Sequence, residues 1–101
     1  MKIKDLITVY ITNYNYGKYI DKCIQSILKQ TYKNIELIII DDGSSDNSKE
    51  NLKKYEKIKK IKIIYQKNKG LNITNNIAIK VSTGRYIIRV DADDWLREDA
   101  L

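Results

Sequence analysis

Residues 35–40 read IELIII, an almost unbroken apolar run in a chain of 101 residues. A strand this apolar is buried on both faces, which is typical of a parallel sheet covered by helices. Shorter apolar runs at residues 6–11, 61–65 and 86–90 predict three more strands. The chain can therefore build one parallel sheet if the intervening segments supply the crossovers.

The segments between these strands have apolar residues at helical spacing and predict three helices, at residues 18–30, 46–57 and 71–82. In the last of them Ile73, Ile77 and Val81 form the apolar stripe, and Gly84 follows where the helix would stop. The order βαβαβαβ implies right-handed crossovers. We therefore predict a single α/β domain over residues 1–101, a Rossmann-like, mostly parallel sheet with helices on both faces.

Composition excludes several chemistries. The chain has no histidine, so Ser-His-Asp triads and histidine metal sites are ruled out. The single Cys23 rules out internal disulfides and a cysteine zinc site. These exclusions leave carboxylates, amides, hydroxyls and lysines as the groups that could carry chemistry.

The net charge of +6 suggests an anionic partner. Residues 49–62 hold seven lysines, but their helical periodicity fits a solvated helix face, so we expect no nucleic-acid binding. No apolar run approaches the roughly 20 residues that span a bilayer, and the N-terminus lacks a signal peptide's pattern. We expect a cytoplasmic location, with possible peripheral contact between the lysine-rich helix and the inner membrane face.

Polar residues follow every predicted strand, in residues 12–17, 41–46, 66–70 and 91–94. In open α/β sheets, ligands bind beyond the carboxyl ends of the strands, near the point where the strand order reverses. The sequence therefore predicts a ligand site at this one edge of the sheet.

The sequence Asp91-Ala92-Asp93 places two carboxylates on one turn after the fourth strand. Such groups repel each other unless a cation or hydrogen-bond donors neutralise them. Mg²⁺ and Mn²⁺ prefer oxygen ligands and bind through one or two carboxylates plus substrate phosphates. The alternative is a plain turn in which Asp94 caps a helix that begins at Trp95.

Asp41, Asp42 and Gly43 follow the buried second strand. A carboxylate there can accept a hydrogen bond from an imide or hydroxyl of a ligand, and Gly43 lets the chain turn closely. A β-turn and helix cap without a ligand would explain the same residues.

The loop at residues 12–16 offers the Thr12 hydroxyl and the flat face of Tyr14, while Asn13 and Asn15 can hold the loop through backbone bonds. Residues 67–70 place lysines before a helix, which favours phosphate. Neither a G-x-x-x-x-G-K-[ST] nor a G-x-G-x-x-G motif is present, which disfavours a P-loop or a dinucleotide site.

Three blocks in order, VYITNYNYGKYIDKCIQSILKQTYKNIELIIIDDGSSDNS, NKGLNITNNIAI and GRYIIRVDADDWL, resemble the N-terminal nucleotide-binding half of family 2 glycosyltransferases. The resemblance covers nearly the whole chain. It implies a GT-A fold and an inverting transfer of sugar from a nucleotide-diphosphate sugar, UDP-linked, to an acceptor hydroxyl.

The resemblance also implies residue roles on the nucleoside side. Thr12 and Tyr14 would line the nucleoside pocket, with Tyr14 stacked on uracil or another base and Asn15 in the same nucleotide-binding loop. Asp42 would accept the ring N–H of the base, with Asp41 beside it.

On the phosphate side, Lys69 would lie near the base and diphosphate, and Asp91 would bind the ribose or the sugar phosphate. Asp93 would coordinate Mg²⁺ or Mn²⁺ bridging the diphosphate. The chain departs from the family where many members have Pro-Thr and this chain has Thr12-Asn13.

No residue matches the family's general base, which follows the Asp-x-Asp motif in relatives, so it is expected beyond Leu101. We therefore expect a donor-binding fragment, truncated after that motif, of an enzyme that acts on a glycan or lipid-linked acceptor. The isolated chain would bind with little turnover and could self-associate through an exposed sheet edge. A non-catalytic nucleotide-binding or interaction module is the alternative.

Overall fold

The computed structural model describes residues 3–101 and contains every predicted strand and helix in the predicted order. Strands alternate with helices as follows: β1 Ile3–Asn13, α1 Ile20–Leu28, β2 Ile35–Asp42, α2 Ser48–Lys53, β3 Ile61–Gln66, α3 Leu71–Val81 and β4 Gly84–Asp91. The predicted α/β class is confirmed.

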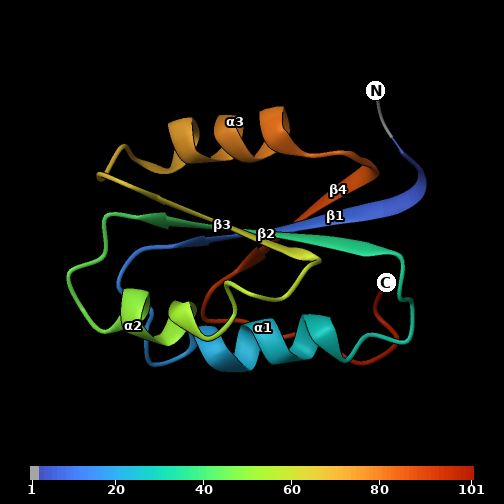
Figure 1. Ribbon diagram of the computed structural model, residues 1–101, viewed down its shortest axis with the longest axis horizontal. Helices are drawn as coiled ribbons and strands as arrows, with labels where there is room; N and C mark the ends of the chain where they lie inside the picture. The colour runs from blue at the N-terminus through green and yellow to red at the C-terminus, as the bar shows by residue number, and fades with distance from the viewer. Residues whose placement is uncertain (1–2) are drawn as a thin grey trace.

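The four strands form one parallel sheet in the order β3-β2-β1-β4 (Figure 1). The register aligns the polar strand ends, since Asn13 lies opposite Asp41 on β2 and Thr12 lies opposite Asp91 on β4. The chain steps from β1 to β2 on one side and returns to β4 on the other, so the strand order reverses at β1. A ligand crevice is expected at that point.

Helices cover both faces of the sheet, with α1 and α2 on one side and α3 on the other (Figure 1). Leu37 and Ile39 pack in the core under α1 and α2, while Ile38 and Ile40 pack against α3. All four are fully buried. Burial of such a side chain contributes about 2 kcal/mol relative to exposure, which explains why β2 is apolar at consecutive positions.

The inward face of α3 differs from the predicted stripe. Thr74 and Ala78 are buried, Ile77 and Val81 are partly buried against the core, and Ile73 is half exposed. The inward stripe is therefore 74, 77, 78 and 81, at regular helical spacing. The prediction of Ile73 was wrong because it weighed only large apolar residues, whereas a small residue at 78 allows the helix to approach the sheet.

The helix α2 is shorter than predicted, and the residues that follow it form turns. Gly84 begins β4 instead of ending α3. No helix begins at Trp95: residues 95–101 fold back over the end of α1, where the Ser26 hydroxyl accepts the Leu96 N–H at 3.0 Å. Within residues 3–101, no helix has the length and apolar character to cross a membrane.

Candidate functional site

A cavity of about 510 Å³ lies beyond the carboxyl ends of β1, β2 and β4. Its lining includes Thr12, Tyr14, Asp42, Asp91 and Asp93, which come from three different strand ends. Asp42 and Asp93, 51 positions apart in the sequence, thus share one cavity. This convergence is the geometry that the strand-end pattern predicted.

Asp41 belongs to the acidic loop, residues 41–46, but its side chain is fully buried and does not line the cavity. Its Oδ1 accepts hydrogen bonds from Asn13 Nδ2 at 2.9 Å and from the Ser44 hydroxyl at 2.6 Å. Its Oδ2 accepts the Ser44 backbone N–H at 3.1 Å. The structure therefore gives Asp41 the role of holding the loop, and a direct contact with a nucleoside stays a prediction.

Asp42 lines the cavity and is also well supplied with donors. Oδ1 accepts the Lys69 backbone N–H at 2.7 Å and Gln66 Nε2 at 2.9 Å, and Oδ2 accepts the Gly70 N–H at 3.1 Å. A carboxylate has about four lone-pair directions, so one direction on Oδ2 remains.

The same contacts set the charge of Asp42. Burial alone would raise the pKa of this carboxyl, but the hydrogen bonds from Gln66 and from the backbone of Lys69 and Gly70 outweigh it and lower the pKa below 3.8. Asp42 is therefore ionised at neutral pH and can accept one further donor. Lys69 takes part through its backbone, and its side chain is not among the cavity-lining groups.

The loop after β1 is clamped to the acidic loop by Asn15, whose backbone is left-handed with a φ of 61°. The Asn15 side-chain oxygen accepts the Ser45 N–H at 2.7 Å and the Asp46 N–H at 3.2 Å. Asn15 does not line the cavity, whereas Tyr14 does and keeps 49% of its surface exposed. The clamp thus presents the Tyr14 ring to the cavity.

Asn13 is a cavity residue that the sequence indicated only as a loop holder. Its Nδ2 donates to Asp41 Oδ1 at 2.9 Å, and this bond fixes the orientation of the amide. The Asn13 Oδ1 is buried and has no hydrogen-bond partner among the described residues. The strand register pairs Asn13 with Asp41 and so brings these two side chains together.

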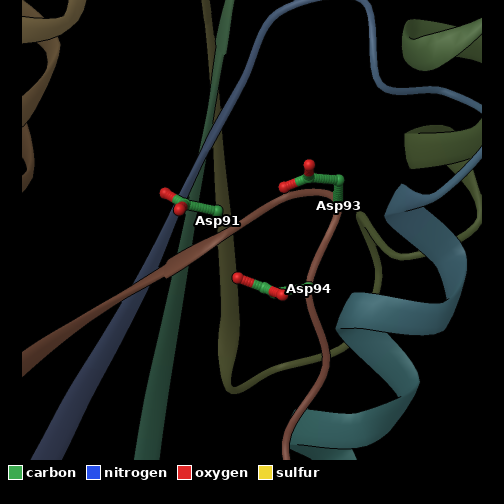
Figure 2. A group of neighbouring side chains, drawn as sticks. All are labelled: Asp91, Asp93 and Asp94. Atoms are coloured by element: carbon green, nitrogen blue, oxygen red, sulfur yellow. The ribbon is translucent and has the colours of Figure 1, made fainter.

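The acidic turn, residues 91–94, is the second acidic feature at this edge. One carboxylate oxygen from each of Asp91, Asp93 and Asp94 lies within 4.8 Å of the others. The Asp94 N–H donates to the Asp91 carbonyl at 2.9 Å, which closes the turn. Figure 2 shows the three side chains at the end of β4 and on the turn that follows it.

Three exposed carboxylates form an oxygen donor set of the kind that Mg²⁺ and Mn²⁺ bind. Asp94 was interpreted only as a helix cap, and the structure instead places it in this cluster. Arg89 was also missed: it lines the cavity, and its Nη2 lies 3.3 Å from Asp91 Oδ1.

Helix α1 contacts the acidic turn through Cys23. The Cys23 thiol donates to the Asp91 carbonyl at 3.5 Å. Burial, and then the negative charges of Asp94, Asp91 and Asp93, raise the pKa of Cys23 to about 12. The thiol therefore stays protonated at neutral pH.

The sequence model of glycosyl transferase family 2 matches residues 8–101. Glycosyltransferase GlyG of Streptococcus pneumoniae is 42% identical over 101 residues, covering 98% of this chain and 34% of that protein. GlyA of the same organism is 41% identical over 98% of this chain and 14% of its own length. Chondroitin synthase of Escherichia coli is 39% identical over 100% of this chain and 15% of its own length. The chain thus spans between 14% and 34% of these relatives.

Solved structures agree in fold. S. aureus TarS 1–349 in complex with UDP superimposes with a TM-score of 0.84 at 27% identity, covering 98% of this chain and 29% of that one. A mannosyltransferase from Pyrobaculum calidifontis has a TM-score of 0.81 at 22% identity over 88% of this chain and 28% of its own, a likeness in fold alone. The parallel sheet and its helices match the GT-A type, and the Asp-x-Asp sequence after β4 is compatible with it. With a family model that matches residues 8–101, this chain belongs to glycosyl transferase family 2.

Proposed function

We propose that this chain binds a nucleotide-diphosphate sugar and a divalent cation, and so supplies the donor site of a glycosyltransferase. The observation that carries the proposal is the single cavity shared by Asp42 and the acidic turn. A donor of this class needs a polar pocket for its base and cationic compensation for its diphosphate. The acidic loop would form the pocket for the base, and the acidic turn, at the other side of the same cavity, would hold the cation that compensates the diphosphate.

The base would lie between Tyr14 and Asp42. The exposed Tyr14 ring offers a stacking face, and the remaining lone pair on Asp42 Oδ2 suits a single ring imide N–H, as in uracil. A UDP-linked donor is further supported by the TarS structures, which were solved with UDP and with UDP-GlcNAc. Thr12 would add a hydroxyl at the same wall.

The cation would be Mg²⁺ or Mn²⁺, held by Asp93 together with Asp91 and Asp94. The donor set fits such an ion, because all three residues offer carboxylate oxygens and all three are exposed. When bound, the ion would neutralise charge on the departing nucleoside diphosphate. The protein's own part is to keep these carboxylates together on the hydrogen-bonded turn.

The proposed reaction is a single displacement with inversion. The acceptor oxygen bonds to the anomeric carbon, the bond from that carbon to the diphosphate oxygen breaks, and the acceptor proton passes to a general base. We place the base and the glycan or lipid-linked acceptor site outside these 101 residues, because the relatives are about three to seven times as long. The single buried Cys23 is compatible with a reducing, cytoplasmic compartment.

We also propose two further contacts. The β4 edge exposes Tyr86, Ile87 and Ile88, which favours self-association by strand pairing. Light scattering after size-exclusion chromatography tests the self-association, and a monomer at high concentration argues against it.

Peripheral contact with anionic lipid through the lysines of residues 49–62 is tested by sedimentation with vesicles containing phosphatidylglycerol.

Calorimetric titration of the chain with UDP and Mn²⁺ tests the donor site. We expect binding by wild type and a loss of at least about tenfold in affinity for Asp93→Ala, because one ligand of the cation is removed. Asp99→Ala is the matched control, since Asp99 is an exposed carboxylate whose one ion pair among the described residues is with Arg97, at 3.6 Å. No heat with wild type, or equal heats for wild type and Asp93→Ala, would contradict the proposal.

A further inference from the structure

Arg89 and Asp91 form an ion pair inside the proposed donor cavity. They lie two residues apart on β4, so both side chains leave the same face of the sheet. Arg89 Nη2 lies 3.3 Å from Asp91 Oδ1, and the two side chains keep 38% and 52% of their surface exposed. An accessible pair of this kind can exchange partners when a ligand arrives, unlike a buried one.

The cavity is lined by more negatively charged than positively charged side chains. Asp42, Asp91 and Asp93 contribute three carboxylates, and Arg89 contributes the one cationic side chain among the described lining residues. The charge of Asp42 is already stabilised by three hydrogen bonds. The uncompensated negative charge is therefore concentrated at the acidic turn, beside Arg89.

A diphosphate needs cations on its path into such a cavity, because carboxylates repel it. The guanidinium of Arg89 has the planar fork that binds phosphate oxygens in pairs. Yet in the free protein this fork is directed to Asp91, one of the three carboxylates that could hold a divalent cation. Arg89 and the cation would compete for the same carboxylate.

We propose that Arg89 is a phosphate-binding residue that changes partners when the donor binds. It neutralises Asp91 in the free protein, and it turns to the donor diphosphate once a divalent cation occupies that carboxylate. This inference rests on the proposed function and adds to it a contact that the protein itself makes with the phosphates. No bond is made or broken in the exchange.

The exchange predicts effects of opposite sign for one substitution. In Arg89→Gln the competing cation is gone, so Mn²⁺ alone should bind about threefold more tightly, as expected for loss of one nearby positive charge. UDP with Mn²⁺ should bind about tenfold more weakly, because a charge-assisted contact to phosphate is lost. Uridine, which has no phosphate, should bind as it does to wild type.

The experiment measures Mn²⁺ alone by electron paramagnetic resonance, UDP with Mn²⁺ by calorimetry, and uridine by ligand-observed NMR. Arg85→Gln is the matched control, because this exposed arginine lies on the same strand about 13 Å away and outside the cavity lining. It removes the same charge and should leave all three affinities near wild type. Arg89→Lys keeps the charge without the fork and should give an intermediate UDP affinity.

Several outcomes would overturn the exchange. Equal UDP affinities for wild type and Arg89→Gln, a weaker Mn²⁺ affinity in Arg89→Gln, or equal losses for UDP and uridine would each do so. Circular dichroism of each variant separates these results from misfolding, and Arg89→Lys provides the same comparison if Arg89→Gln does not fold. If wild type itself fails to bind UDP, the proposed function fails; if wild type binds and Arg89→Gln binds equally, only the exchange fails.

Discussion

The acidic loop after β2 and the acidic turn after β4 flank the same strand, β1, yet their aspartates are in opposite situations. Asp41 and Asp42 are 0% and 6% exposed, and each accepts three hydrogen bonds from the protein. Asp91, Asp93 and Asp94 are exposed, and within residues 3–101 their one ion pair is with Arg89.

The difference shows what separates a scaffold carboxylate from a binding carboxylate at the same edge of a sheet. Lone pairs that are filled by backbone and side-chain donors stabilise a loop and leave little for a ligand. Lone pairs that are unfilled, on three groups close together, repel each other until a cation arrives. The acidic loop should therefore matter mainly for stability, and the acidic turn mainly for binding.

The largest effect is expected for Asp41→Ala. The substitution leaves the Ser44 backbone N–H and hydroxyl without their acceptor and leaves Asn13 Nδ2 only its 3.3 Å contact with the Ser44 hydroxyl, which should lower the free energy of unfolding by about 3 kcal/mol. Urea unfolding measures it. Asp93→Ala, at the exposed turn, should unfold at nearly the wild-type urea concentration, and equal losses for the two variants would erase the proposed difference.

Gly43→Ala should have the next largest effect on the free energy of unfolding. Gly43 has a φ of +78°, and an added Cβ would lie 2.6 Å from the backbone nitrogen of Asn68, so both strain and a clash arise. We expect a loss of about 2 kcal/mol or more in the free energy of unfolding. Gly70→Ala is the control, because Gly70 has a φ of +88° but no atom within 4 Å of the added Cβ. A larger loss at Gly70 than at Gly43 would mean that packing at the acidic loop is looser than described.

Divalent cations should raise the free energy of unfolding, and they should do so by binding at the acidic turn alone. At a Mn²⁺ concentration about ten times its dissociation constant, binding stabilises the folded chain by about 1.4 kcal/mol, which thermal unfolding can resolve. Asp93→Ala should lose this increment, and Gly70→Ala should retain it. An increment that persists in Asp93→Ala would place the cation elsewhere.

Asp42 should contribute to the pH dependence of stability. Hydrogen bonds from Gln66, Lys69 and Gly70 overcome burial and lower its folded pKa below the ordinary 3.8, so its contribution is complete above that value and is lost as the pH falls through the folded pKa. Urea unfolding at pH 6 and at successively lower pH values should show a shallower decline for Asp42→Asn than for wild type. A decline in Asp42→Asn as steep as that of wild type would contradict the assignment.

Local patterns were enough to predict the architecture. The apolar run of β2, the helical spacing of the three crossovers and the polar strand ends each depend on residues close in sequence, and together they predicted the parallel sheet and the shared cavity of Asp42 and Asp93. The same patterns failed on the inward face of α3, since helical periodicity fixes the spacing of a stripe but not the packing that small residues allow.

The difference between the acidic loop and the acidic turn was decided in part by contacts between residues far apart in the sequence. Ser44 donates to Asp41 from three positions away, but Asn13 donates to Asp41 and Gly70 donates to Asp42 from 28 positions away each, and only the strand register and the loops bring these distant donors into place. The pairing of Arg89 with Asp91 and the clustering of Asp94 depend likewise on side-chain directions at the end of β4. An aspartate at a strand end can be read from the chain, but whether its lone pairs are filled depends on which distant groups the folded backbone places around it.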